Sequence, residues 1–250
     1  MTTVVDKRQF RIRRMFGQIA PWYDFLNHLL SLNIDRSWRR KTTKLVPSEG
    51  VDAGPILDLC TGTGDLAIAY DRAAKGKLSI VGADFCHEML VRAKSKSEKA
   101  GLEKRIDFIE ADAQELPFPA DMFQITCVSF GLRNIQDTER GLSEMVRVTK
   151  PGGRVAVLEF SKPRGRIIGP VYRWYFSKLL PWIGHLFSRN SESAYSYLPQ
   201  SVMSFPDYEA LADLMAKHGL CDVQFTPFTF GIATLYVGRK PMSANGTASR

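Results

Sequence analysis

The sequence contains few cysteines and no long hydrophobic run. Cys60, Cys86, Cys127 and Cys221 are widely spaced, and the chain has no Cys-x-x-Cys pair and no neighbouring pair of histidines. This spacing argues against a disulfide framework and against a metal site, and most of these thiols are predicted to be buried in or beside strands. Because no run of roughly 18 or more apolar residues occurs, no segment is predicted to cross a bilayer.

The sequence also lacks a signal peptide and internal repeats. Residues 1–10 are polar and charged, so we expect a cytoplasmic protein. The 250 residues suit one α/β domain, which we assign to residues 1–242, with an N-terminal helical cover over 1–46 and an apolar, basic helical insertion over 162–200. Residues 243–250 are small and polar and are predicted to form a disordered tail.

Acidic residues are outnumbered by basic ones, and the formal net charge is +8. No acid lies between Glu159 and Glu192, a stretch that contains basic residues together with Trp174, Tyr175, Trp182 and other apolar side chains. This mixture is typical of a helix in a membrane interface, where each cation near an anionic surface adds about 1 kcal/mol. A cap whose aromatic side chains form a core and whose cations are solvated explains the same pattern. The sequence leaves both interpretations open.

Residues 56–66, with the sequence ILDLCTGTGDL, have the pattern of a short buried strand, a glycine turn and the start of a helix. Gly62 and Gly64 permit a positive φ or the close approach of a ligand. Such a turn binds small molecules at the carboxyl edge of a parallel sheet. Together with Ala67 it also fits the dinucleotide fingerprint, and Asp84 follows at about the twentieth position, where a ribose partner is expected.

Two carboxylates argue against a dinucleotide at this turn. Asp58 lies within the strand, and Asp65 stands in the first turn of the helix, where a pyrophosphate would need the free N–H groups and the positive end of the helix dipole. We expect Asp65 to occupy or repel that anion, as capping acids do. S-adenosyl-L-methionine has no phosphate and carries a sulfonium and an ammonium, so nearby acids favour it. The motif therefore predicts an S-adenosyl-L-methionine site.

Further strands are predicted to alternate with helices, which implies right-handed crossovers and a mostly parallel sheet. A C-terminal pair of strands is predicted to form an antiparallel hairpin at the sheet edge. The predicted strands after the first cover residues 77–84, 105–113, 123–130, 154–160, 223–230 and 233–238.

The ends of these strands supply further ligand candidates. Asp84 suits a grip on two ribose hydroxyls, and Asp112 suits an adenine amino group, with Ala113 as a flat wall beside the base. Each acid alone is equally well explained as a helix cap or a solvated strand end. Acids at successive strand ends of one sheet make that explanation less favourable.

Several longer motifs resemble the family of menaquinone and ubiquinone C-methyltransferases, which are class I S-adenosyl-L-methionine-dependent enzymes. The most specific are FGLRN at 130–134 and LEFSKP at 158–163, preceded by LPF at 116–118. Residues 16–24 (FGQIAPWYD) and 193–198 (SAYSYL) resemble its flanking signatures, so that the likeness runs from about Arg14 to Gly238. This chain departs from the family pattern at Gly17, often an acid, and at Asn33, often a glycine.

The resemblance implies an α/β fold with a Rossmann-like, mostly parallel seven-stranded sheet, helices on both faces and an antiparallel C-terminal hairpin. It also implies transfer of a methyl group from S-adenosyl-L-methionine to a ring carbon of a prenylated quinol. We favour demethylmenaquinol as the acceptor. The alternatives are a polyprenyl methoxybenzoquinol of ubiquinone biosynthesis and a non-catalytic cofactor-binding subunit of a quinone-synthesis complex. The family's cofactor contacts correspond to Thr63, Asp84, Asp112, Ala113 and Ser129.

An aryl carbon is a poor nucleophile until a ring hydroxyl ionises, so the site must remove or polarise that proton. Candidates after the fourth strand are Arg133 and Asn134, of which Arg133 would stabilise a phenolate because an arginine is too basic to accept a proton. On the N-terminal cover the candidates are Tyr23, Asp24 and His28. Asp24 or His28 would take the proton directly or through water, although a surface or packing role is the better explanation of His28.

A prenylated acceptor keeps its tail in the bilayer, so we expect peripheral association with the inner face of an anionic membrane. Nucleic acid is not an expected partner, because the segment after the fourth strand is SFGLRN rather than an Asn/Asp-Pro-Pro-Tyr motif. Cys127 also lies within an apolar strand, unlike a nucleophile for cytosine methylation. The sequence is compatible with a homo-oligomer.

Overall fold

The structure is a computed structural model that describes residues 6–31, 33–50, 53–166, 168–174 and 192–242. The predicted tail at 243–250 and the central part of the predicted insertion, 175–191, lie outside the described residues.

The described strands form one seven-stranded sheet with the order β3-β2-β1-β4-β5-β7-β6. Neighbouring strands from β3 to β5 are parallel, whereas β7 is antiparallel to both β5 and β6. The predicted fold class, including the C-terminal hairpin, is confirmed. The strands are β1 (Ile56–Leu59), β2 (Ile80–Asp84), β3 (Ile106–Glu110), β4 (Phe123–Ser129), β5 (Thr149–Phe160), β6 (Cys221–Phe228) and β7 (Ala233–Arg239).

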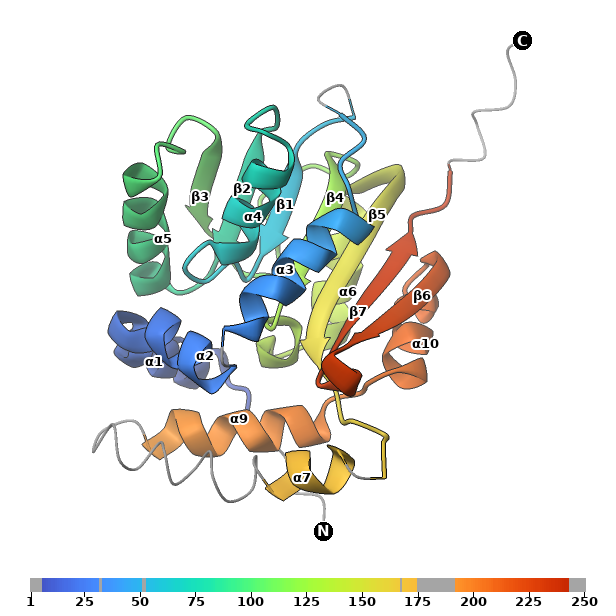
Figure 1. The fold of residues 1–250 in the computed structure, drawn as a ribbon. Coiled ribbons are helices and arrows are strands. Elements are labelled where there is room, and N and C mark those ends of the chain that lie inside the picture. Colours follow the sequence, from blue (N-terminus) through green and yellow to red (C-terminus); the bar gives the residue numbers. More distant parts are fainter. Residues whose placement is uncertain (1–5, 32, 51–52, 167, 175–191, 243–250) are drawn as a thin grey trace.

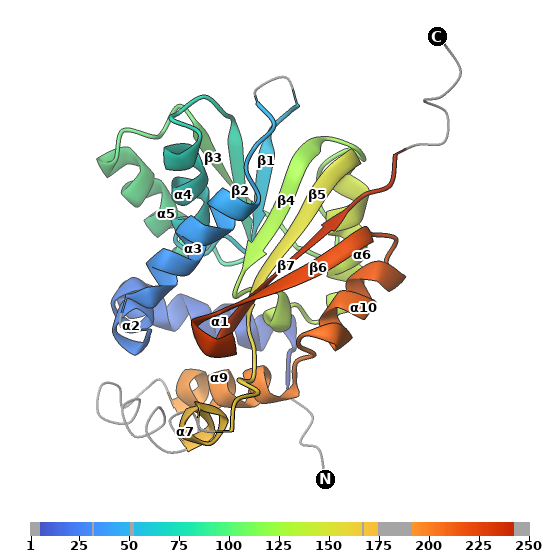
Figure 2. The same cartoon turned by 45° about the vertical axis from the view of Figure 1, so that its right-hand side comes forward.

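Helices cover both faces of the sheet, which is why the central strands are almost continuously apolar (Figures 1 and 2). One face packs against α3 (Ile34–Leu45), α4 (Asp65–Ala73) and α5 (His87–Lys99). The opposite face packs against α6 (Thr138–Val148) and α10 (Glu209–Lys217).

The N-terminal helices lie at the carboxyl ends of the parallel strands (Figure 1). They are α1 (Gln9–Ile19), the 3₁₀ turn η1 (Ala20–Trp22) and α2 (Tyr23–Leu30), followed by α3. Asn33 precedes α3 with φ of 61°, a left-handed conformation that asparagine tolerates better than most residues. This geometry explains why Asn33 can stand where related sequences often have glycine.

Two helices from the later part of the chain lie beneath α1, as both ribbon views show (Figures 1 and 2). They are α7 (Ile168–Trp174) and α9 (Glu192–Ser204), and α9 contacts both α1 and the 3₁₀ turn η2 (Leu132–Asn134) that follows β4. In the described ranges, no helix combines the length and the apolar character needed to cross a bilayer.

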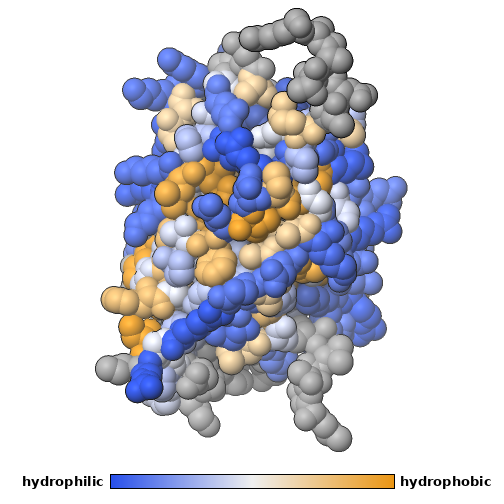
Figure 3. All heavy atoms as spheres, turned by 90° about the vertical axis from the view of Figure 1, so that its right-hand side faces the viewer, coloured by the Kyte–Doolittle hydropathy of each residue, from blue (hydrophilic) through white to orange (hydrophobic). Residues whose placement is uncertain are grey.

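The edge of the sheet at β6 faces the viewer in Figure 3, where hydrophilic side chains form a diagonal band and hydrophobic ones gather above it. The hairpin reaches this edge through η4 (Thr229–Gly231). Half-buried Ile232 and Val237 pack against the core on this side. On the sheet face that packs against α3, α4 and α5, the part formed by β7 and β6 is therefore less completely covered than the part beneath these helices.

Candidate functional site

A cavity opens at the carboxyl ends of β1, β2, β3 and β4, beneath α1 and the start of α2. Its space is about 650 Å³ when the open mouth is included. The lining residues come from four strand ends and the N-terminal cover. They include Gln9, Phe16, Tyr23, Leu59, Cys60, Gly62, Ala83, Asp84, Phe85, Met89, Asp112, Ala113, Gln114, Ser129, Phe130, Gly131, Asn134, Ile135 and Gln136.

The floor of the cavity is made of backbone in an uncommon conformation. Cys60 directly after β1 and Phe130 directly after β4 both have positive φ, 51° and 59°. Non-glycine residues in this region are strained, and such strain concentrates at functional sites. The two turns also touch, because a Cβ at Gly131 would lie 2.4 Å from the Cβ of Cys60. A glycine at 131 is therefore required for the two strand ends to approach.

Asp84 ends β2 and directs a carboxylate toward the cavity. It accepts the backbone N–H groups of Gly62 at 2.8 Å and Cys86 at 2.9 Å, which fix its orientation. Burial raises the pKa of Asp84 to about 6, against the lowering effect of these hydrogen bonds. Its role of holding ribose hydroxyls stays a prediction; donation from such hydroxyls would favour the ionised carboxylate.

Asp58 does not line the cavity but lies beneath the glycine turn, with 1% of its surface exposed. One of its oxygens accepts the Thr61 hydroxyl at 2.6 Å and the backbone N–H of Ala67 at 3.1 Å. Ala67 is in the first turn of α4, so the strand acid fills the anion site at this helix N-terminus. Burial raises the pKa of Asp58 to about 7.

Asp65 was the acid expected to fill or repel an anion at that helix, and its position corrects the expectation. Its carboxylate turns instead to Lys96 of α5, with an N–O distance of 2.8 Å, and lies 3.8 Å from Arg39 of α3. Burial acts to raise the pKa of Asp65, but these two cations lower it. The exclusion of a pyrophosphate therefore rests on Asp58 and its bond to Ala67 rather than on Asp65.

Lys96 also connects the N-terminal cover to the glycine turn. Its ammonium lies 2.6 Å from Asp24 of α2 and 3.0 Å from the Thr63 hydroxyl, and Thr63 in turn donates to Asp24 at 2.5 Å. Neither Asp24 nor Thr63 lines the cavity, and Gly64 lies outside its lining as well. In this arrangement Asp24 and Thr63 hold the cover against the turn.

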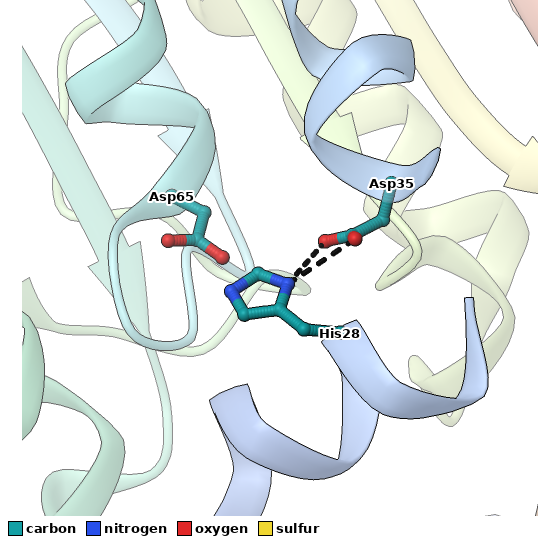
Figure 4. A group of neighbouring side chains, drawn as sticks. All are labelled: His28, Asp35 and Asp65. Atoms are coloured by element: carbon teal, nitrogen blue, oxygen red, sulfur yellow. Dashed lines mark hydrogen bonds and ion pairs between the residues drawn. The ribbon is translucent and has the colours of Figure 1, made fainter. Parts of the chain in front are cut away.

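His28 belongs to the same ion network (Figure 4). Its Nδ1 lies 3.0 Å from a carboxylate oxygen of Asp35, and the ligand atoms of His28, Asp35 and Asp65 lie within 4.8 Å of one another. Such a group could in principle hold a cation. The Arg39 guanidinium already bonds to Asp35, and the Ser31 hydroxyl donates to it at 2.7 Å. The group is therefore a salt-bridge network that joins α2, α3 and α4.

Asp112 lines the cavity after β3, but its carboxylate is occupied by protein donors. Gln9 of α1 donates its side-chain N–H at 2.6 Å, and Gln114 donates its backbone N–H at 2.9 Å. Ala113 lies beside it in the wall. Asp112 and Ala113 thus both line the cavity, and their role toward adenine stays a prediction.

The segment after β4 forms the opposite wall. Arg133 is 6% exposed and does not line the cavity; its guanidinium donates to Glu159 at 2.7 Å and to the Phe130 carbonyl at 2.5 Å. Ser129 and Asn134 do line it, and the Ser129 hydroxyl and the Asn134 carbonyl oxygen have no hydrogen-bond partner among the described residues. Buried polar atoms without partners are uncommon in folded proteins and point to a missing ligand.

Sequence reasoning chose seven residues that the structure brings to the cavity wall: Tyr23, Gly62, Asp84, Asp112, Ala113, Ser129 and Asn134. It missed Gln9, which no motif marks, and Cys60, although Cys60 stands inside the glycine motif. It also missed Glu159, which binds Arg133 and lies within the LEFSKP segment that was used only for the resemblance.

The residues present fit S-adenosyl-L-methionine. The unpaired Ser129 hydroxyl and the Asp84 carboxylate face one cavity, and the helix N-terminus that a phosphate would need is filled by Asp58. Gly62 and Gly64 have φ of 55° and 82°, a left-handed conformation that favours glycine at both positions of the turn.

Comparison with known proteins agrees with this fit. Residues 1–240 match the model of the ubiE/COQ5 methyltransferase family. The chain is 47% identical over 231 residues to a ubiquinone/menaquinone biosynthesis C-methyltransferase UbiE of Geobacter sulfurreducens, which covers 92% of this chain and 88% of that protein. It is 48% identical over 227 residues to a demethylmenaquinone methyltransferase of Thermus thermophilus, covering 91% of this chain and 100% of that protein.

Solved structures show the same fold at low identity. One is a SAM-dependent methyltransferase of Thermotoga maritima, described as a possible histamine N-methyltransferase, with a TM-score of 0.64, 17% identity and coverage of 92% of this chain and 99% of that chain. Another is a phosphoethanolamine N-methyltransferase of Haemonchus contortus in complex with S-adenosylhomocysteine, with a TM-score of 0.59, 17% identity and coverage of 82% and 53%. The resemblance inferred from the motifs is confirmed.

Proposed function

The chain belongs to the ubiE/COQ5 methyltransferase family and uses S-adenosyl-L-methionine; on that premise we propose that it methylates a ring carbon of a prenylated quinol, with demethylmenaquinol as the favoured acceptor. The observation that carries this proposal is a cavity with two wall acids, Asp84 and Asp112, on one side and unpaired polar groups after β4 on the other. The names of the relatives agree with such an acceptor.

The cofactor side of the cavity is formed by β1, β2 and β3. Asp84 would accept the ribose hydroxyls, and Asp112 with Ala113 would bind the adenine after Gln9 releases Asp112. Gly62 after β1 and Ser129 at the end of β4 line the cavity on the side of Asp84 away from Asp112, and they would contact the methionine part. S-adenosyl-L-methionine supplies an activated methyl group on a positively charged sulfur, so these residues need only bind and align it.

The acceptor side is formed by η2 and the N-terminal cover. Tyr23 and Asn134 reach the cavity from opposite walls and would position the quinol ring. Burial raises the pKa of Tyr23, so its hydroxyl stays protonated and acts as a hydrogen-bond donor. Arg133 would stabilise the developing phenolate from behind this wall, held by Glu159. Asp24 remains a candidate for the proton only if it leaves Lys96.

We also propose that the cover docks on an anionic membrane surface. On α1 and its neighbours, Phe10, Trp22 and Phe25 are 78%, 67% and 55% exposed. The helix α1 contains three arginines and no acid. Apolar side chains together with cations suit the lipid interface, and Tyr23 next to Trp22 faces the cavity. A headgroup could thus enter the cavity while its tail stays in the bilayer.

The acceptor is tested by incubating the pure protein with methyl-labelled S-adenosyl-L-methionine and matched prenylated naphthoquinol and benzoquinol in detergent. We expect label in the naphthoquinol ring at the higher rate. A faster benzoquinol reaction would replace demethylmenaquinol as the acceptor, and absence of label from both would remove the quinol proposal.

Membrane docking is tested by sedimentation with anionic and zwitterionic vesicles. We expect binding to the anionic vesicles that weakens with salt, because surface charges are screened. Trp22→Ser with Phe25→Ser should weaken it, whereas Val91→Ser should not, although Val91 on α5 is 53% exposed as well. Equal binding by all three proteins would rule out the cover as the docking surface.

A further inference from the structure

Several buried polar atoms without partners lie in or behind the acceptor-side wall of the cavity, and one of them belongs to a residue of a distant helix that does not itself line the cavity. Within the described part of the chain, Arg133 Nε and Tyr197 Oη are buried without a hydrogen-bond partner, as are the Ser129 and Asn134 oxygens. Ser129 ends β4, and Arg133 and Asn134 belong to η2 just after it, but Tyr197 belongs to α9. Nothing in the site described so far uses Tyr197.

Tyr197 is packed next to the cavity wall. It is 4% exposed and forms a cluster with Ile12 and Met15 of α1, against which Phe16 and Phe85 pack. Phe16 and Phe85 line the cavity. The helix that bears Tyr197 also contacts η2, the segment of Arg133 and Asn134, and lies beneath α1 in both ribbon views (Figures 1 and 2).

The electrostatic surroundings keep Tyr197 a donor. Burial raises its pKa to about 12, and the charges of Arg133 and Glu159 are close enough to act on it. Its hydroxyl is therefore protonated at neutral pH and faces a region that contains the Arg133 guanidinium. Arg11 and Asp6 also act on Tyr197, and Arg133 and Glu159 act on Lys7 as well, so that this region holds three cations and two carboxylates. A surplus of positive charge favours an oxyanion.

A buried hydroxyl without a partner costs folding free energy, so its presence next to the cavity calls for a ligand. Resting on the proposed function, we propose that Tyr197 donates a hydrogen bond to a ring oxygen of the methyl acceptor and is an acceptor-binding residue of this enzyme. The phenol group and Arg133 then hold that oxygen from two sides. This fixes the ring carbon relative to the methyl donor and stabilises the oxygen when it ionises.

The chain provides a matched comparison. Tyr70 of α4 is 1% exposed, and its hydroxyl is also buried without a partner in the described residues. Neither tyrosine lines the cavity, but Tyr70 belongs to the core cluster on the α3–α4–α5 face of the sheet, whereas Tyr197 packs with Phe16 and Phe85, which do line it. Tyr70 therefore has the same burial as Tyr197 but not the same neighbours.

The test is Tyr197→Phe, which removes the hydroxyl and keeps the ring. We expect kcat/KM for the quinol to fall about 10- to 100-fold, the size of a lost hydrogen bond to a charged oxygen. The dissociation constant of S-adenosylhomocysteine should stay unchanged, and Tm should not fall, because no protein bond is lost. The acid limb of the kcat/KM profile should move to higher pH, since the acceptor oxygen ionises less readily. Tyr70→Phe should leave kcat/KM, the dissociation constant and the pH profile unchanged, and its Tm should not fall either.

Three results would overturn the inference. Wild-type kcat/KM and an unmoved pH profile in Tyr197→Phe would show that the hydroxyl does not reach the acceptor. A loss of turnover matched by lost cofactor affinity or by a lower Tm would make its role structural. Absence of quinol methylation by the wild-type protein would remove the proposed function and this inference together, whereas an active wild type with an equally active Tyr197→Phe would remove the inference alone.

Discussion

Cofactor binding should depend on pH through Asp84. In the free protein burial raises the pKa of this carboxyl to about 6, and it already accepts two backbone N–H groups. Ribose hydroxyls that donate to it require the ionised form. Above this pKa Asp84 is already ionised, and cofactor binding requires no release of a proton from it. Below its pKa each pH unit adds about 1.4 kcal/mol for removing the proton, which is tenfold in affinity.

The assay is titration calorimetry with S-adenosylhomocysteine between pH 5 and 8. We expect a dissociation constant that is flat above about pH 7 and that rises toward tenfold per unit below about pH 6. Asp84→Asn is the control, because it cannot titrate. It should bind about 10- to 100-fold more weakly at pH 8, as expected for losing a charged acceptor, and should show no such rise. Equal pH dependence in the variant and the wild type would refute the role of Asp84.

Three further predictions concern the frame of the site. Gly131→Ala should destabilise the protein by roughly 2 kcal/mol or more and abolish cofactor binding, because its Cβ would overlap Cys60. The control is Gly165→Ala, in which the atom nearest to the added Cβ is 3.9 Å away, and its urea midpoint should stay near the wild-type value. Lys96→Met should lower the unfolding free energy by about 1 kcal/mol, since its ion pairs are partly exposed, and protease cleavage of the N-terminal cover should become faster. The unfolding free energy should decrease from about pH 4 to 7, because burial raises the pKa of Asp58 to about 7 and the folded protein is then most stable when this carboxyl is protonated. Urea unfolding of Asp58→Asn should show a flatter dependence of the unfolding free energy on pH. An identical pH dependence in the variant and the wild type would contradict this.

The alternation of apolar segments and turns was sufficient to predict the sheet, because a parallel sheet covered on both faces needs strands that are apolar throughout. The glycine turn and the acids at strand ends were likewise readable, since the carboxyl ends of parallel strands meet at one edge. For this reason Asp84 and Asp112 could be assigned before any coordinates. The predicted bounds erred at strand starts: β2 begins at Ile80 rather than at 77.

The sequence alone determined the family, the cofactor and the residues that the sheet itself brings to its edge, because those depend on local pattern and strand order. Only the tertiary structure decided which acid caps α4, since Asp58 and Asp65 are both aspartates on either side of the glycine turn. Asp58 accepts the N–H of Ala67 in α4, whereas Asp65 pairs with Lys96. The tertiary structure also decided that Asp24 bonds to Lys96, that Gln9 reaches Asp112 and that α9, which carries Tyr197, packs against η2. These contacts join segments distant in the chain, and their geometry depends on how whole helices pack, which no local pattern specifies.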